Sequence, residues 1–188
     1  MSFFLQAICV EGGLAVIAIL ADGLFRLNLN YWNYCRCNDT TFFLIVCGLQ
    51  PLVAGYFVLQ ALPLAALQRI DRLVRQMFWQ HMGHWKLWQF ALIAALAGLG
   101  EELLFRGLLQ LGLSTMLPVW LAVLTASVLF GLAHAATPTY CFLAFIISLY
   151  LGWLFVLTGN LLVPIAIHAL YDFCVFLFIR WTPRKHEE

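Results

Sequence analysis

Six apolar stretches, each long enough to cross a bilayer, follow one another along the chain and constrain its fold more than any other feature. A helix needs about 20 residues to cross the hydrocarbon core of a membrane. Short polar breaks separate the stretches, so we predict an all-α, polytopic transmembrane helix bundle of about six spans. The stretches cover residues 3–25, 42–67, 88–111, 115–136, 139–158 and 161–180.

The composition agrees with a membrane protein, because 64% of the 188 residues are hydrophobic and only 10% are charged. A soluble domain carries about 25% charged residues, so this chain lacks the polar side chains that coat a water-soluble globule. The formal net charge of +1 gives no reason to expect a nucleic-acid partner.

A single integral membrane domain over residues 1–188 is expected at this length. Residues 1–67 would form two accessory spans, and residues 87–180 a core of four spans. Between them, residues 68–86 mix arginines with aromatic residues, a pattern typical of an amphipathic helix at the membrane interface.

Lysine and arginine are divided unequally between the two ends of the predicted bundle. With six spans, the 68–86 segment and the C-terminal tail share one side with the N-terminus. Because basic residues concentrate on the cytoplasmic side, we expect both termini there. The few short loops favour a prokaryotic inner or plasma membrane. The richer side holds Arg69, Arg72, Arg75, Lys86, Arg180, Arg184 and Lys185, and the other holds Arg26 and Arg36.

Six ionisable side chains fall well inside the last four spans. A charge near the bilayer centre costs at least about 2.5–3.5 kcal/mol, so several together are expected to meet one another or to line a wet cavity. Glu11 and Asp22 also lie in an apolar stretch, and we interpret them as isolated polar residues near a span end or between helices. The six are Glu101, Glu102, Arg106, His134, His168 and Asp172.

The first group of these residues contains two adjacent glutamates. Glu102 and Arg106 are four residues apart with the acid first, the favourable order for an ion pair on one helix face. Glu101 is rotated by about 100° from Glu102 and has no local partner. An unpaired carboxylate in apolar surroundings suits a general base or acid. The alternative is that both glutamates only hold helices together.

Two histidine motifs follow on separate spans. Phe130 and His134 share a helix face, so the ring can form the wall of a pocket into which the imidazole points. His168 and Asp172 share a face in the same way, so the carboxylate can orient the imidazole or share its proton. Each motif alone also fits a structural role, but three motifs on separate spans of one bundle favour a catalytic site.

The expected depths of these groups in the membrane do not coincide. If its span begins near Gln89, Glu101 lies about 18 Å deep. His134 lies near the cytoplasmic end of its span, and His168 lies nearer the middle of the membrane. A tilt or kink of the third stretch would bring the groups together. Three glycines permit it: Gly98, Gly100 and Gly107.

The three motifs, taken in order, resemble those of the CPBP family, the CAAX-protease and bacteriocin-processing proteins, also described as type II CAAX prenyl endopeptidase Rce1-like or Abi proteins. The resemblance covers about residues 88–180. It implies an intramembrane endopeptidase of the glutamic type, whose partners are the lipid bilayer and a membrane-bound peptide or protein substrate. It does not select among a prenylated CAAX tail, a bacteriocin leader and a C-terminal sorting segment, and the oligomeric state stays open.

The resemblance also implies roles for the site residues. Glu101 and His134 would activate a water molecule, and His168 with Asp172 would stabilise the oxyanion. The family more often has Asn where this chain has Asp172. Because an ionised Asp accepts hydrogen bonds but cannot donate them, we expect Asp172 to orient His168 instead. The residues expected to be structural are Glu102, Arg106 and Phe130.

Two other functions stay open on the residues alone. A zinc-dependent intramembrane protease would bind the metal through His134, His168 and a carboxylate, but the chain lacks a His-Glu-x-x-His motif. The expected cofactor set is therefore none, with zinc as the alternative. A non-enzymatic scaffold or proton-coupled transporter would use the same groups to relay protons, although no inverted repeat is visible. Cys35 and Cys37 form a Cys-x-Cys pair in a polar loop, and this pair alone assigns them no role.

Overall fold

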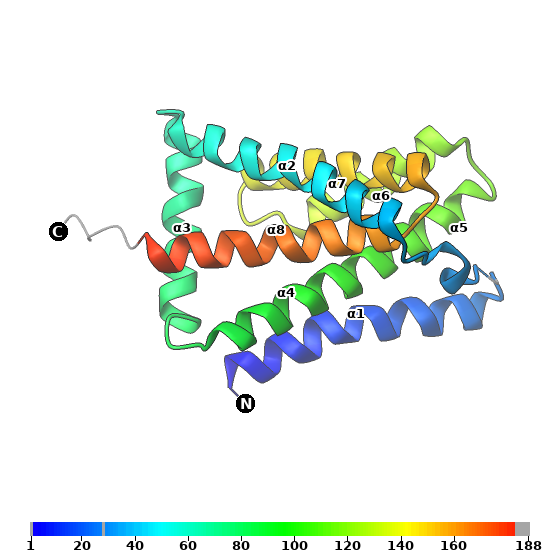
Figure 1. The fold of residues 1–188 in the computed structure, drawn as a ribbon, viewed down its shortest axis with the longest axis horizontal. Coiled ribbons are helices and arrows are strands. Elements are labelled where there is room, and N and C mark those ends of the chain that lie inside the picture. The colour runs from blue at the N-terminus through cyan, green and yellow to red at the C-terminus, as the bar shows by residue number, and fades with distance from the viewer. Residues whose placement is uncertain (1, 28, 183–188) are drawn as a thin grey trace.

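The computed structural model describes residues 2–27 and 29–182, which form a helical bundle with one helix lying across its end (Figure 1). The described residues contain no strand, so the predicted all-α fold is confirmed. The crossing helix is α3 (Ala65–His81), and a short helix η1 (Tyr31–Tyr34) lies at the opposite end. The main bundle helices are α1 (Phe3–Phe25), α2 (Asp39–Ala61), α4 (Leu87–Glu102), α6 (Val119–Ala133), α7 (Pro138–Thr158) and α8 (Leu162–Trp181).

Four helices in the described ranges, α1, α2, α7 and α8, are long and apolar enough to cross a membrane, and α6 is a shorter apolar helix. Large apolar side chains cover their outer surfaces. A soluble protein rarely exposes contiguous apolar surface on this scale, whereas a lipid-facing surface requires it. The chain is therefore an integral membrane protein. Examples of these exposed residues are Val16, Leu20 and Leu24 of α1, Phe42, Phe43 and Val58 of α2, and Leu157 of α7.

The third apolar stretch forms one continuous helical run. α4 passes directly into η2 (Leu103–Gln110), whose turns are π-helical, and then into α5 (Leu111–Ser114). Two polar side chains attach this run to α7. Arg106 Nη2 donates to the carbonyl oxygen of Ser148 at 2.9 Å and to its Oγ at 3.1 Å, and Gln110 Nε2 donates to the carbonyl oxygen of Gly152 at 3.1 Å. Wide π-helical turns are frequent next to functional sites, and this one follows the two glutamates directly.

The second helix ends earlier than its apolar stretch. α2 stops at Ala61, two residues before Pro63, because a proline disfavours helical geometry in the residue that precedes it. The chain then turns into α3, whose residues partly bury against the bundle. Arg75 forms an ion pair with Asp71 at 2.9 Å and donates to the carbonyl oxygen of Thr182 at 2.7 Å. These contacts hold α3 against the C-terminal end of α8.

The helices α4 and α8 approach each other closely at Gly98. A Cβ atom at this position would lie 2.7 Å from the carbonyl oxygen of Ile165 and 2.8 Å from the amide nitrogen of Ala169. The two helices cross obliquely there (Figure 1). The crossing brings the C-terminal end of α4 against the middle of α8, and so removes the mismatch in depth between Glu101 and His168.

We expect Gly98→Ala to lower the free energy of unfolding by about 1–3 kcal/mol, because the added methyl group meets backbone atoms that cannot rotate away. The matched control is Gly13→Ala on α1, where a Cβ atom has no neighbour within 4 Å. Equilibrium unfolding of each purified variant in detergent measures its free energy of unfolding. Equal stability of the two variants would contradict this packing.

Candidate active site

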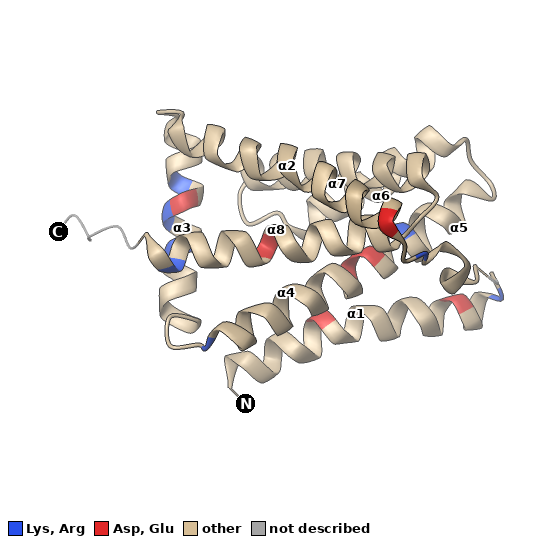
Figure 2. Cartoon of the chain, viewed as in Figure 1, with Lys and Arg blue, Asp and Glu red and all other residues tan. Residues whose placement is uncertain are grey.

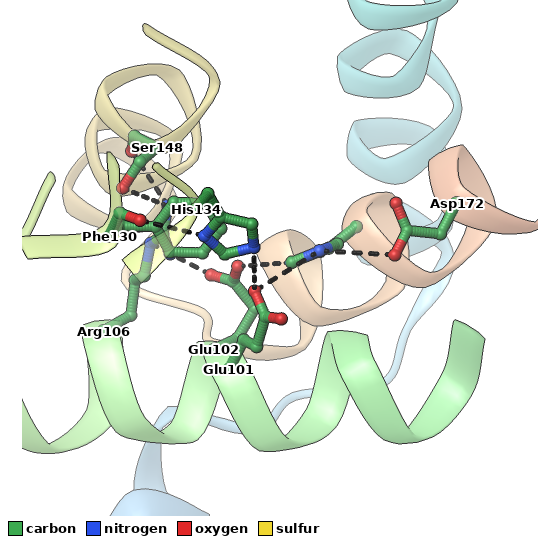
Figure 3. Close-up of polar contacts among 8 residues, drawn as sticks. Glu101, Glu102, Arg106, Phe130, His134, Ser148 and Asp172 are labelled. Atoms are coloured by element: carbon green, nitrogen blue, oxygen red, sulfur yellow. Dashed lines mark hydrogen bonds and ion pairs between the residues drawn. The ribbon is translucent and has the colours of Figure 1, made fainter. Parts of the chain in front are cut away.

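Ionisable side chains from three helices meet inside the bundle (Figure 3). Glu101 lies near the end of α4, His134 follows the last residue of α6, and His168 and Asp172 lie one turn apart on α8. The Oε2 atom of Glu101 is 3.6 Å from Nε2 of His134 and 3.9 Å from Nε2 of His168. Asp172 Oδ2 is 3.6 Å from the same His168 nitrogen. The four side chains predicted to be catalytic are thus neighbours in space.

Glu101 has an oxygen that the protein leaves unsatisfied. Its Oε2 atom is enclosed and has no hydrogen-bond partner among the described residues. Both histidine nitrogens lie just beyond hydrogen-bonding distance. A buried acceptor without a donor costs folding free energy, so it is unusual in a purely structural role. This oxygen is therefore available to accept a hydrogen bond from a water molecule or a substrate.

Glu102 contacts two partners, Arg106 and His168. Its Oε2 atom lies 3.0 Å from Nε of Arg106, the ion pair expected from their spacing, and the side chains are 0% and 1% exposed. Its Oε1 atom accepts a hydrogen bond from Nδ1 of His168 at 2.8 Å. Glu102 therefore links the buried arginine to one of the two histidines of the site.

The orientation of His168 differs from the expectation based on sequence. We expected Asp172 to orient this imidazole, but the carboxylate on its Nδ1 atom belongs to Glu102, and Asp172 lies 3.6 Å from the other nitrogen. The physical reason is the close crossing of α4 and α8. It brings Glu102 into contact with His168, although the two residues are 66 positions apart in the sequence. Spacing within one helix cannot reveal such a contact.

His134 is held by the residue four positions before it. Its Nδ1 atom lies 2.9 Å from the carbonyl oxygen of Phe130, which can only accept, so Nδ1 carries the hydrogen. The imidazole stacks on the Phe130 ring with centroids 4.3 Å apart and an interplanar angle of 17°. The Arg106 guanidinium also lies over this ring, 5.2 Å from its centroid. Phe130 therefore positions the imidazole and separates it from the arginine.

A cavity of about 500 Å³ opens beside these groups. Glu101, His134, His168 and Asp172 form a polar part of its wall, and most of the remaining wall is apolar. α2 and α3 contribute to this wall, although the sequence suggested accessory spans and an interfacial helix for these regions. Its apolar lining includes Leu52, Leu59, Val74, Leu143, Ile147 and Phe176.

Sequence reasoning missed two polar residues of this region, both on α7. Ser148 accepts hydrogen bonds from Arg106, and Tyr140 lines the cavity beside the ionisable groups. Neither carries a charge at neutral pH, so a search for charges inside spans passes over them. A search for uncharged polar residues in the 139–158 stretch would have found both.

The described residues include no group of three or more His, Cys, Asp and Glu side chains placed to hold a metal ion. The two histidine Nε2 atoms nevertheless point toward the same carboxylate oxygen, the donor types that zinc prefers. The zinc alternative stays a prediction, and metal analysis of the purified protein decides it.

A model of the family described as Type II CAAX prenyl endopeptidase Rce1-like matches residues 83–174. This segment is similar to an Rce1-like domain. The matched segment begins just before α4 and ends within α8, so it contains all six ionisable side chains of the predicted site. The family resemblance drawn from the three motifs is thereby confirmed, and the match supports protease activity in the membrane. Searches among curated proteins and among solved structures found no match.

Proposed function

We propose that this protein is a glutamic endopeptidase that hydrolyses a peptide bond in a membrane-associated peptide or protein. The observation that carries the proposal is the meeting of Glu101, His134 and His168 at one wall of an apolar cavity. The carboxylate oxygen at their centre lacks a hydrogen-bond partner among the described residues. Such a cluster supplies the acid–base groups that hydrolysis needs, in surroundings that shield the reaction from bulk water.

The proposed reaction uses one water molecule and regenerates the enzyme. Glu101 takes a proton from the water molecule while the water oxygen bonds to the carbonyl carbon of the substrate. The electron pair of the C=O double bond moves to the carbonyl oxygen. The C–N bond then breaks, the nitrogen takes the proton from Glu101, and the C=O bond reforms. The products are a new carboxyl terminus and a new amino terminus.

Both histidines are oriented for this reaction through their Nδ1 atoms. His134 donates to the Phe130 carbonyl and His168 donates to Glu102, so each imidazole turns its Nε2 atom toward the site. In the proposal, the Nε2 atom of His134 accepts the second hydrogen of the water and fixes its position. His168 and Asp172 line the far side, where the substrate carbonyl would lie.

The apolar cavity wall suits a hydrophobic side chain or a prenyl chain on the substrate. The family description names prenylated CAAX proteins, so a prenylated CAAX tail is the first substrate class that we propose. A bacteriocin leader and a C-terminal sorting segment are the other two classes, and an apolar wall accommodates hydrophobic residues of either.

Comparison of membrane-protein termini by mass spectrometry tests the proposal in the cell. We expect termini that appear with the wild-type protein and disappear with Glu101→Ala at equal expression. The sequence before each new terminus identifies the substrate class. Identical termini in the two strains would contradict peptidase activity.

We propose that the end of the bundle bearing α3 faces the cytoplasm of a prokaryotic cell, with both termini on that side. The charges support this orientation, because most of the described basic residues cluster at the α3 end (Figure 2). Arg26 and Arg36 lie at the opposite end, near η1. Arg184 and Lys185, which also entered the charge count, lie outside the described residues.

This orientation predicts that a membrane-impermeant maleimide labels Cys37 in intact spheroplasts. Cys37 is exposed between η1 and α2, at the end opposite to α3. Gel-shift detection of the labelled protein measures the reaction, and Cys37→Ser controls for the other cysteines. Labelling that requires permeabilised membranes would reverse the proposed orientation.

A further inference from the structure

The reaction also needs hydrogen-bond donors at the substrate carbonyl. Peptide hydrolysis places negative charge on the carbonyl oxygen, and donors aimed at that oxygen stabilise the transition state. Glu101 and Asp172 accept hydrogen bonds when ionised. The Nδ1 hydrogens of His134 and His168 are already donated to Phe130 and Glu102, so neither of these hydrogens is directed at the substrate.

Tyr140 brings a neutral donor to the same cavity. It lies in the first turn of α7, where its amide nitrogen donates to Oγ1 of the capping residue Thr137 at 3.1 Å. Pro138 precedes it at the first helical positions and further fixes the backbone. The helix start therefore holds the tyrosine in place with little freedom.

The Tyr140 ring packs edge-on near the His134 ring in the wall of the cavity. The two ring centroids are 6.2 Å apart at an interplanar angle of 61°, and Tyr140 lines the cavity together with the ionisable groups. Its hydroxyl group makes no hydrogen bond with any described residue. This hydroxyl group is thus free to donate in the cavity that Glu101 and His134 also line.

We propose that the Tyr140 hydroxyl group donates a hydrogen bond to the carbonyl oxygen of the scissile peptide bond and stabilises the negative charge that develops there. The inference rests on the proposed peptidase function and adds a catalytic residue to it. In the step already described, the electron pair that moves to the carbonyl oxygen meets the Tyr140 O–H group, which keeps its proton. The hydrogen bond weakens when the C=O bond reforms.

A tyrosine outside the cavity provides a matched control. Tyr34 of η1 does not line the cavity, and its ring packs edge-on against Phe155, with centroids 5.8 Å apart. Removal of its hydroxyl group therefore changes a tyrosine of the bundle without changing the cavity.

The test uses purified protein and a peptide that spans the most abundant Glu101-dependent cut found by the comparison of termini. We expect Tyr140→Phe to lower kcat by about 10²-fold with KM close to the wild-type value, because the lost interaction is made in the transition state. Tyr34→Phe is expected to keep kcat near wild type. Both variants should unfold at the wild-type temperature.

The outcomes separate this inference from the proposed function. If Glu101→Gln is inactive while Tyr140→Phe keeps full kcat, the peptidase function stands and the role of Tyr140 is overturned. Equal losses in Tyr140→Phe and Tyr34→Phe would assign the effect to a general change in the bundle and overturn it too. If no terminus depends on Glu101, the proposed function itself fails, and the role of Tyr140 fails with it.

Discussion

Glu101→Gln is expected to lower kcat by about 10³-fold, the largest effect on activity that the site predicts. Glutamine has the size of glutamate but cannot take a proton from water or return it to the leaving nitrogen. Because the Glu101 Oε2 atom has no hydrogen-bond partner among the described residues, this replacement removes only its ionic contacts with His134 and His168, at 3.6 and 3.9 Å. The variant should therefore fold and unfold like the wild type. Initial rates with the peptide substrate, measured beside thermal unfolding, check both statements.

A second glutamate in the membrane is the matched control for this variant. Glu11 lies on α1, where it contacts α4 next to Gly100, and its Oε2 atom is likewise enclosed without a hydrogen-bond partner among the described residues. It does not line the cavity of the proposed site. Glu11→Gln replaces a carboxyl group by an amide in the same way and should keep kcat near wild type. Loss of activity in both variants would show that charge in the bundle, and not the chemistry of Glu101, controls the rate.

Arg106→Met is expected to cause the largest loss of stability, about 3–5 kcal/mol of the free energy of unfolding. The change leaves the fully buried carboxylate of Glu102 without its cation, and it also removes the hydrogen bonds to Ser148 that attach the π-helical turns to α7. Equilibrium unfolding of the purified protein in mixed micelles measures the difference.

Two companion variants identify the cause of this loss. In Glu102→Gln/Arg106→Met the buried charge is gone, so most of the lost stability should return. Arg69→Met removes an exposed arginine of α3 and should stay within about 0.5 kcal/mol of the wild type. If the double variant is less stable than Arg106→Met alone, the Glu102 carboxylate is not the source of the cost.

Local spacing predicted much of the fold and part of the site. Apolar stretches predict where helices lie, because lipid requires helices of a minimum length with internally satisfied backbones. The four-residue spacing of Glu102 and Arg106 predicted their ion pair, since residues four apart lie on one face of a helix. The same reasoning left Glu101 without a partner on its own helix, and in the structure both carboxylates approach His168 of α8, Glu101 at Nε2 and Glu102 at Nδ1.

Contacts between helices could not be predicted in this way. The sequence indicated Gly98 as a point where the helix could bend, but in the structure it permits the close crossing of α4 and α8 that lets Glu102 accept a hydrogen bond from His168. Because of that contact, Glu102 orients the imidazole through Nδ1, the role that we expected of Asp172. The position of Tyr140 beside His134 likewise depends on how α7 starts and packs, and no spacing within one helix reports it.

Activity of the purified wild-type protein after metal removal distinguishes water activation by side chains from zinc catalysis. If Glu101 and His134 activate water without a resident metal ion, protein dialysed against a chelator, with no stoichiometric metal by elemental analysis, cleaves the peptide substrate at its original rate. Loss of cleavage on chelation and its return on addition of zinc would contradict metal-free water activation, and would make the two histidines and the carboxylate metal ligands instead.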